Sequence, residues 1–114
     1  MGVDIRPKDE LSQVVFIHDY LQLVFQGDGF SIYNRATLEV GEKSLQQGHD
    51  GFCDSLVGLI GKHVVEIGHS DLLALILTFE CGTRLLVSAR DEDARGPEAF
   101  QFNRRDGTIV IEQN

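Results

Sequence analysis

The stretch that decides the fold reads Leu21-Gln22-Leu23-Val24-Phe25-Gln26-Gly27-Asp28-Gly29-Phe30-Ser31-Ile32-Tyr33. Its first residues alternate between apolar and polar, which is typical of a half-buried strand. Gly27-Asp28-Gly29 indicates a tight turn, because glycine reaches the positive φ values that hairpin turns need. The apolar segment 30–33 then returns as a second strand, so the stretch predicts a β-hairpin.

The second half of the chain repeats this pattern. Val14-Val15-x-Ile17 matches Val64-Val65-x-Ile67, and Leu21-x-Leu23-x-Phe25 matches Leu75-x-Leu77-x-Phe79. A glycine turn and an apolar strand follow in each half. Two readings remain open: a duplicated three-stranded meander, or the general likeness of any two β-meanders.

One helix is predicted between the two sets of strands. Asp50 is the expected N-cap, since its carboxylate can accept from free backbone N–H groups of the first turn. Gly61 is the expected glycine with positive φ after the helix. One helical face carries the apolar side chains of Phe52, Leu56, Leu59 and Ile60.

These patterns predict an α+β fold that is mainly antiparallel β: two repeated β-meanders of seven or eight strands in total, with one short central helix. They would form a rolled sheet or a small sandwich or barrel. The 114 residues suit a single domain, 1–114, in which the polar segment 1–10 is expected to be flexible. Because a meander leaves its outer strands unpaired, a homodimer through a sheet edge is the alternative architecture.

Charge and composition limit the partners. Eighteen acidic and ten basic residues give a formal net charge of −8, which speaks against nucleic acid as a partner and suits either a basic protein or simple solubility. Residues 1–10 are charged and lack the apolar core of a signal peptide, and no apolar run is long enough to span a membrane. We therefore expect a cytoplasmic protein with no membrane association, in which Cys53 and Cys81 stay reduced.

The residues that carry catalytic or metal chemistry elsewhere do not form a recognisable motif here. His49 and Cys53 stand four apart, but a structural zinc site needs four ligands. Cys53 lies near a helix start but between Asp50 and Asp54, which disfavour a thiolate, so a small, partly buried residue is expected. His18-Asp19 and His69-Ser70-Asp71 fit turns. No catalytic, cofactor-binding or metal-binding residue is assigned, and no cofactor is expected.

The segment that most invites a binding role is Asp91-Glu92-Asp93, with Glu98 beyond it. One interpretation is a solvated loop. The other is a docking site for a basic protein partner, because complementary charge accelerates and selects association.

Parts of the chain resemble a family of small bacterial β-rich proteins of unknown function. The likeness lies in Leu59-Ile60-Gly61-Lys62-x-Val64, in Leu75-x-Leu77-x-Phe79-x-x-Gly82-x-x-Leu85, in Pro97-Glu98-Ala99-Phe100-Gln101-Phe102 before Asp106-Gly107, and in Asp19–Phe25. Phe100 departs from a tryptophan that is frequent there in the family. The resemblance implies an immunity protein that neutralises a bacterial toxin, and it assigns no catalytic residue.

The leading hypothesis is thus a non-catalytic protein-binding module. The first alternative is a small enzyme or ligand-binding β-barrel, which requires a pocket that brings His18, His69 or Cys53 together. The second alternative is a structural homo-oligomeric module.

Overall fold

The structure is a computed structural model that describes residues 4–114. These residues form ten strands, one α-helix and one short 3₁₀ turn. In chain order the elements are β1 (Gln13–Phe16), β2 (Leu21–Phe25), β3 (Asp28–Ile32), β4 (Ala36–Val40), β5 (Lys43–Gln46), α1 (Phe52–Val57), β6 (Val64–Gly68), β7 (Leu73–Phe79), β8 (Arg84–Ser88), η1 (Asp91–Asp93), β9 (Glu98–Asn103) and β10 (Ile109–Gln113).

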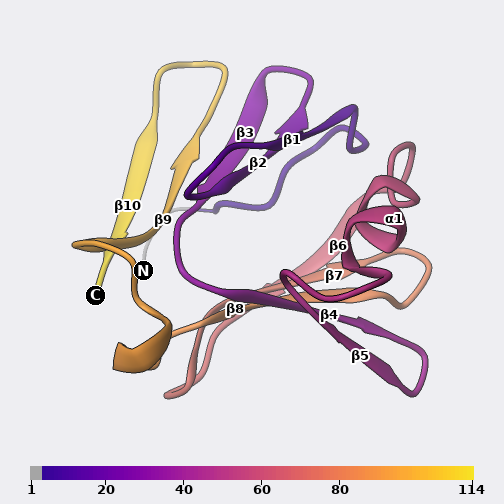
Figure 1. Ribbon diagram of the computed structural model, residues 1–114. Helices are drawn as coiled ribbons and strands as arrows, with labels where there is room; N and C mark the ends of the chain where they lie inside the picture. Colours follow the sequence, from indigo (N-terminus) through magenta and orange to yellow (C-terminus); the bar gives the residue numbers. More distant parts are fainter. Residues whose placement is uncertain (1–3) are drawn as a thin grey trace.

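The strands form two five-stranded antiparallel sheets that face each other and do not close into a barrel (Figure 1). Sheet A has the order β1-β2-β3-β9-β10, and sheet B has the order β5-β4-β8-β7-β6. The prediction of a mainly antiparallel α+β fold with one short helix is therefore confirmed, whereas the barrel variant of it is wrong.

Each half of the chain contributes a two-stranded hairpin to the sheet that the other half begins, an arrangement called the hairpin exchange below. The meander β1-β2-β3 of the first half is extended by β9-β10 of the second half, and the meander β6-β7-β8 is extended by β4-β5 of the first half. The strand pairing at these two junctions also corresponds. In sheet A, β3 pairs with β9 over four residue pairs, from Ile32↔Phe100 to Gly29↔Asn103. In sheet B, β8 pairs with β4 over four residue pairs, from Val87↔Ala36 to Arg84↔Glu39. Each sheet therefore needs strands from both halves.

The core lies between the sheets. Alternate side chains of the inner strands point into it, as the period of two in the sequence predicts. Phe30 is the centre of the aromatic part of the core. The centroid of its ring lies 4.8 Å from that of Phe102 and 6.0 Å from that of Phe100.

The N-terminal segment 1–10 is described in part. Residues 1–3 lie outside the described part of the chain, and Ile5 and Pro7 are buried.

The two segments that lead into β1 and β6 meet between the sheets. The Leu11 N–H donates to the Lys62 carbonyl at 2.9 Å, and the Gly61 N–H donates to the Leu11 carbonyl at 2.8 Å. Gly61 has the predicted positive φ, 93°. These two bonds tie corresponding points of the two halves together.

The helix differs in part from its prediction. Asp50 does not cap it: the N-cap is Gly51, with φ 90° and no side-chain hydrogen bond. The helix ends at Val57, so Ile60 lies in the following turn and is exposed instead of sharing the buried face of Phe52 and Leu56. No helix among residues 4–114 has the length and apolarity needed to cross a membrane.

Candidate functional site

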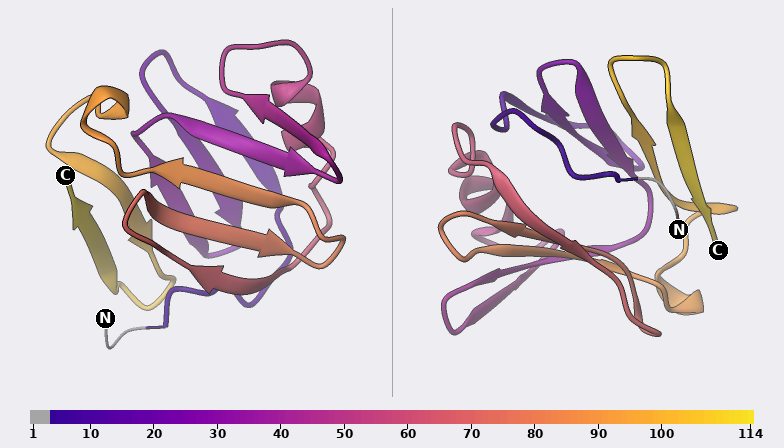
Figure 2. Two further views of the ribbon diagram at one scale, coloured as in Figure 1. Left: turned by 90° about the horizontal axis from the view of Figure 1, so that it is seen from below. Right: turned by 180° about the vertical axis from the view of Figure 1, so that it is seen from behind.

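Two connections lead from one sheet to the other, and they are called the crossings below. The acidic segment that the sequence pointed to lies on one of them. Asp91–Asp93 form η1 in the β8–β9 connection, and the β3–β4 connection runs beside it. The Arg35 N–H, in that second connection, donates to the Asp93 carbonyl at 3.1 Å, and the Ser88 N–H donates to the Arg35 carbonyl at 3.0 Å. Both crossings lie on the side of the molecule opposite α1 (Figure 2).

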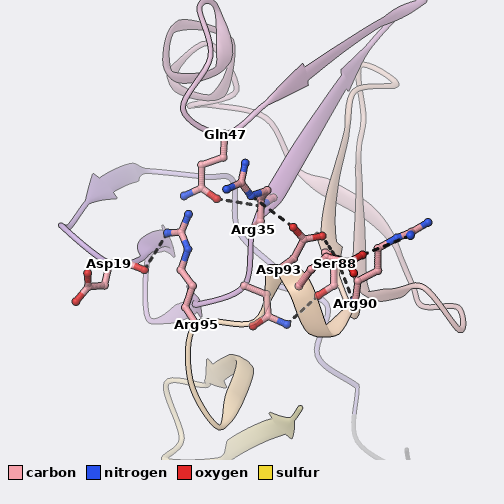
Figure 3. A network of polar contacts seen from close by, with 10 residues as sticks. Asp19, Arg35, Gln47, Ser88, Arg90, Asp93 and Arg95 are labelled. Carbon is pink, nitrogen blue, oxygen red and sulfur yellow. Dashed lines mark hydrogen bonds and ion pairs between the residues drawn. The ribbon is translucent and has the colours of Figure 1, made fainter.

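Asp93 points inward and stabilises this crossing. The Ser88 hydroxyl donates to Asp93 Oδ2 at 2.7 Å, and Arg35 Nε lies 3.5 Å from Asp93 Oδ1 (Figure 3). Both carboxylate oxygens are thus engaged within the protein, and the side chain is only 23% exposed. Asp93 is a structural residue of the turn and not part of its outward-facing charge.

Asp91 and Glu92 are the outward-facing carboxylates of the turn. Both residues are exposed. Glu92 Oε1 lies 3.5 Å from Arg90 Nη1, with both side chains more than half exposed, so water and salt screen this pair and it holds Glu92 only weakly. The turn therefore presents two negative charges on a backbone that Asp93 fixes in place.

Glu98 lines a small hollow next to the turn. The hollow has a volume of about 230 Å³ and is lined by Asp19, Tyr33, Arg95, Gly96, Pro97 and Glu98. The Oε2 atom of Glu98 is buried and accepts no hydrogen bond from any described residue. Such an oxygen costs free energy until a donor reaches it.

Two further side chains that line the hollow, Arg95 and Tyr33, make contacts with other parts of the chain. Arg95 Nη1 donates to the Asp19 carbonyl at 3.3 Å, and the ring of Tyr33 lies 5.3 Å from that of Tyr20. The structure therefore places Glu98 in a hollow whose lining includes none of residues 91–93, so the two parts of the predicted site lie in the β8–β9 connection and at the start of β9 without sharing a hollow. The hollow adds Tyr33 and Asp19, which lie far away in the chain and which no sequence pattern linked to this site.

The histidines and cysteines are spread over the surface. His18 is 96% exposed and pairs with its neighbour Asp19 at 3.5 Å, while His69 lines a separate hollow near the end of β10. Cys53 is exposed, so the expectation of a partly buried residue is wrong. In the part of the chain that the structure describes, no three His, Cys, Asp or Glu side chains are grouped to hold a metal ion.

A second hollow of about 420 Å³ lies at the ends of the β2–β3 and β9–β10 hairpins. Lys8, Asp9, Asp28, Arg104, Arg105 and Asp106 line it. The Arg105 N–H donates to Asp28 Oδ1 at 3.0 Å, and Arg104 Nη1 lies 3.8 Å from Asp28 Oδ2. The Arg105 side chain lies against Gly27 and leaves no room for a Cβ there. Positive and negative side chains are equal in number, so the hollow has no net charge.

Comparisons with protein-family models, with curated proteins and with solved structures return no match for this chain.

Proposed function

We propose that the protein is a non-catalytic binding module for a basic protein partner, and that it acts as a cytoplasmic immunity protein that neutralises a toxin. The observation that supports this proposal most directly is the inward engagement of Asp93 by Ser88 and Arg35. It holds η1 rigidly, so that the charges of Asp91 and Glu92 are displayed without a further loss of backbone entropy on binding.

Charge supports the proposal on a larger scale. A net charge of −8 on 114 residues produces a negative field that attracts a basic partner before contact. The hollow at Glu98 then supplies a short-range feature, since Glu98 contributes an acidic side chain to its lining and carboxylates form strong charge-assisted hydrogen bonds with ammonium and guanidinium groups. We name Asp91, Glu92 and Glu98 as the partner-binding residues and assign Asp93 to the support of the turn.

The test is capture of partners from a lysate of the source organism with tagged protein, washed at low and then at high salt. We expect one stoichiometric basic protein that is released as salt rises, because exposed charge pairs are screened. The purified pair is then titrated with the double variant Asp91→Asn/Glu92→Gln and with Glu98→Gln. The first is expected mainly to slow association, and the second to speed dissociation.

A matched control removes the same charge elsewhere. Glu42→Gln/Asp54→Asn neutralises two exposed carboxylates in the β4–β5 turn and in α1, and it should leave the affinity near that of the wild type. Equal losses from both double variants would show that only net charge matters and would contradict the assignment of the site. Recovery of the tagged protein alone, from cells that express the partner, would contradict the function.

A small-molecule site is the second candidate, and the hollow at Asp28 favours it. Arg104 and Asp28 are largely buried there, 15% and 9% exposed, and both signs of charge line the walls. Such a site suits a small zwitterion. A thermal-shift screen of amino acids tests this candidate: a ligand that stabilises the wild type but not Arg105→Ala would support it.

A further inference from the structure

The outer face of sheet A, which points away from sheet B, carries no ionisable side chain in its two central register rows. Its one paired acidic residue is Glu98, which pairs with Gln113 at the start of β9. The register places two rows of five side chains there, because alternate residues of neighbouring strands share a face. One row is Val15, Gln22, Ser31, Gln101 and Ile111, and the other is Gln13, Val24, Gly29, Asn103 and Ile109.

Sheet B provides an internal comparison, because it has the same strand connections. Its outer face carries Glu39, Arg84 and Glu66 in its register rows, and Arg84 Nη2 lies 2.8 Å from Glu39 Oε1. Two neighbouring rows without charge therefore distinguish sheet A from sheet B. They occur in a chain of which 25% is charged.

The uncharged face is open. None of the described elements lies on the far side of sheet A (Figures 1 and 2). Ile109 and Ile111, on the outer strand β10, are 58% and 44% exposed. Between them and the valines lie amide and hydroxyl groups that partly pair with one another: Gln22 Nε2 donates to Ser31 Oγ at 3.3 Å, and Gln101 Nε2 donates to Asn103 Oδ1 at 2.9 Å.

We infer that this face is the contact surface between two copies of the chain, packed sheet to sheet about a two-fold axis. Two copies each carry a net charge of −8 and repel each other, but the ten positions of the two central rows carry no carboxylate. The cores of protein interfaces are likewise depleted of charged residues. Amide and hydroxyl groups also suit an isologous contact, since each supplies both a donor and an acceptor to its symmetry mate.

The size of the face sets the strength of the contact. Five strands about 4.8 Å apart and about five residues long, at about 3.4 Å per residue, give a face of roughly 400 Å². Two such faces bury roughly 800 Å² in total, which is below the range of stable specific interfaces and in that of weak, transient contacts. We therefore expect a reversible dimer whose population depends on concentration.

Sedimentation equilibrium over a range of concentrations tests the inference with the wild type, Val24→Lys and Thr78→Lys. Val24 lies on the second strand of its meander, away from both sheet edges, and Thr78 is its counterpart on the outer face of sheet B. Both variants change the net charge equally and reduce the repulsion between copies. We expect a wild-type dimer, a dissociation constant raised about tenfold or more by Val24→Lys because a charge is buried without a partner, and little change with Thr78→Lys.

Every other result overturns the inference. A wild type that stays monomeric up to on the order of 1 mM has no such contact. A dimer that survives Val24→Lys must use another surface, such as the edge of β10, and equal losses from both variants would show no preference for sheet A. If circular dichroism shows that Val24→Lys has not folded, Gln22→Lys repeats the test at a position that already carries a long polar side chain.

Discussion

The side-chain amides of Asn34 and Asn114 form a reciprocal pair of hydrogen bonds. Asn34 Nδ2 donates to Asn114 Oδ1 at 2.7 Å, and Asn114 Nδ2 donates back to Asn34 Oδ1 at 3.1 Å. Asn34 also donates to the Ser88 carbonyl at 2.9 Å, and Asn114 to the Gly96 carbonyl at 2.7 Å. This amide pair, of which Asn34 is buried, thus joins the β3–β4 connection, the end of β8 and the end of β10. It lies next to the hollow that Glu98 lines, since Asn114 donates to Gly96 in the lining of that hollow.

Asn34→Ala should destabilise the fold by about 1–3 kcal/mol, because it removes the hydrogen bonds of a buried amide to Ser88 and Asn114. Urea denaturation measures the loss. Asn114→Ala should cost less, since Asn114 is exposed. The double variant should lose less than the sum of the two single variants, because both remove the same bonds. Strict additivity would show that the pair contributes nothing as a unit.

Asp93→Ala should lower the free energy of unfolding by about 1 kcal/mol, chiefly through the lost hydrogen bond from Ser88. Asp91→Ala, two residues earlier and exposed, should leave it nearly unchanged. Thermal unfolding of the two variants side by side gives the comparison. If Asp91→Ala proves the more damaging of the two, the assignment of Asp93 as the support of the turn is wrong.

Gly61→Ala should cost about 1–2 kcal/mol, because its φ of 93° is unfavourable for a residue with a Cβ. Gly96→Ala is the control, since a Cβ at Gly96 meets no atom within 4 Å and the backbone there is not left-handed. It should be neutral or slightly stabilising. Chemical denaturation of both variants checks the contrast, which would fail if the two changes cost the same.

The acid side of the stability profile should depend on Glu80. The His63 backbone N–H donates to Glu80 Oε1 at 2.8 Å, and this bond, together with the His63 ring at 3.4 Å, holds the pKa of Glu80 below its ordinary value of 4.5. A carboxyl group with a lowered pKa in the folded state stabilises the fold above its unfolded pKa. That contribution is lost as the pH falls below about 4.5 through the folded pKa.

Glu80→Gln should therefore flatten the fall in melting temperature between neutral pH and the acid range, while Glu42→Gln, in an exposed turn, should follow the wild type. Melting curves at closely spaced pH values provide the measurement. A profile of Glu80→Gln that runs parallel to the wild type would contradict the linkage.

Much of the fold was predictable because it rests on local signals. The alternation at Leu21–Phe25 and the positive φ of Gly61 were predicted correctly. The strand β5 was missed, since Lys-Ser-Leu-Gln is polar and is a strand only because β4 pairs with it. The cap at Asp50 failed because Gly51 takes a left-handed conformation and becomes the N-cap itself.

The candidate site was predictable only as a segment. Sequence could point to the acidic run 91–93, but it could not show that Asp93 turns inward, since its partner Arg35 lies far away in the chain. The same holds for the hollow at Glu98, which depends on Tyr33 and Asp19 across the crossing. No local sequence signal shows which sheet each hairpin joins, because a hairpin can pair with the meander of its own half or with that of the other half.

That exchange has a consequence for how the protein is made. During synthesis the first half leaves the ribosome as a meander whose sheet lacks its last two strands until β9 and β10 follow. Sheet B is complete once β8 has emerged, whereas sheet A waits for β10, so sheet A is expected to fold last. By the same geometry, two copies of a half-length chain could build both sheets, if each copy added its hairpin to the meander of the other.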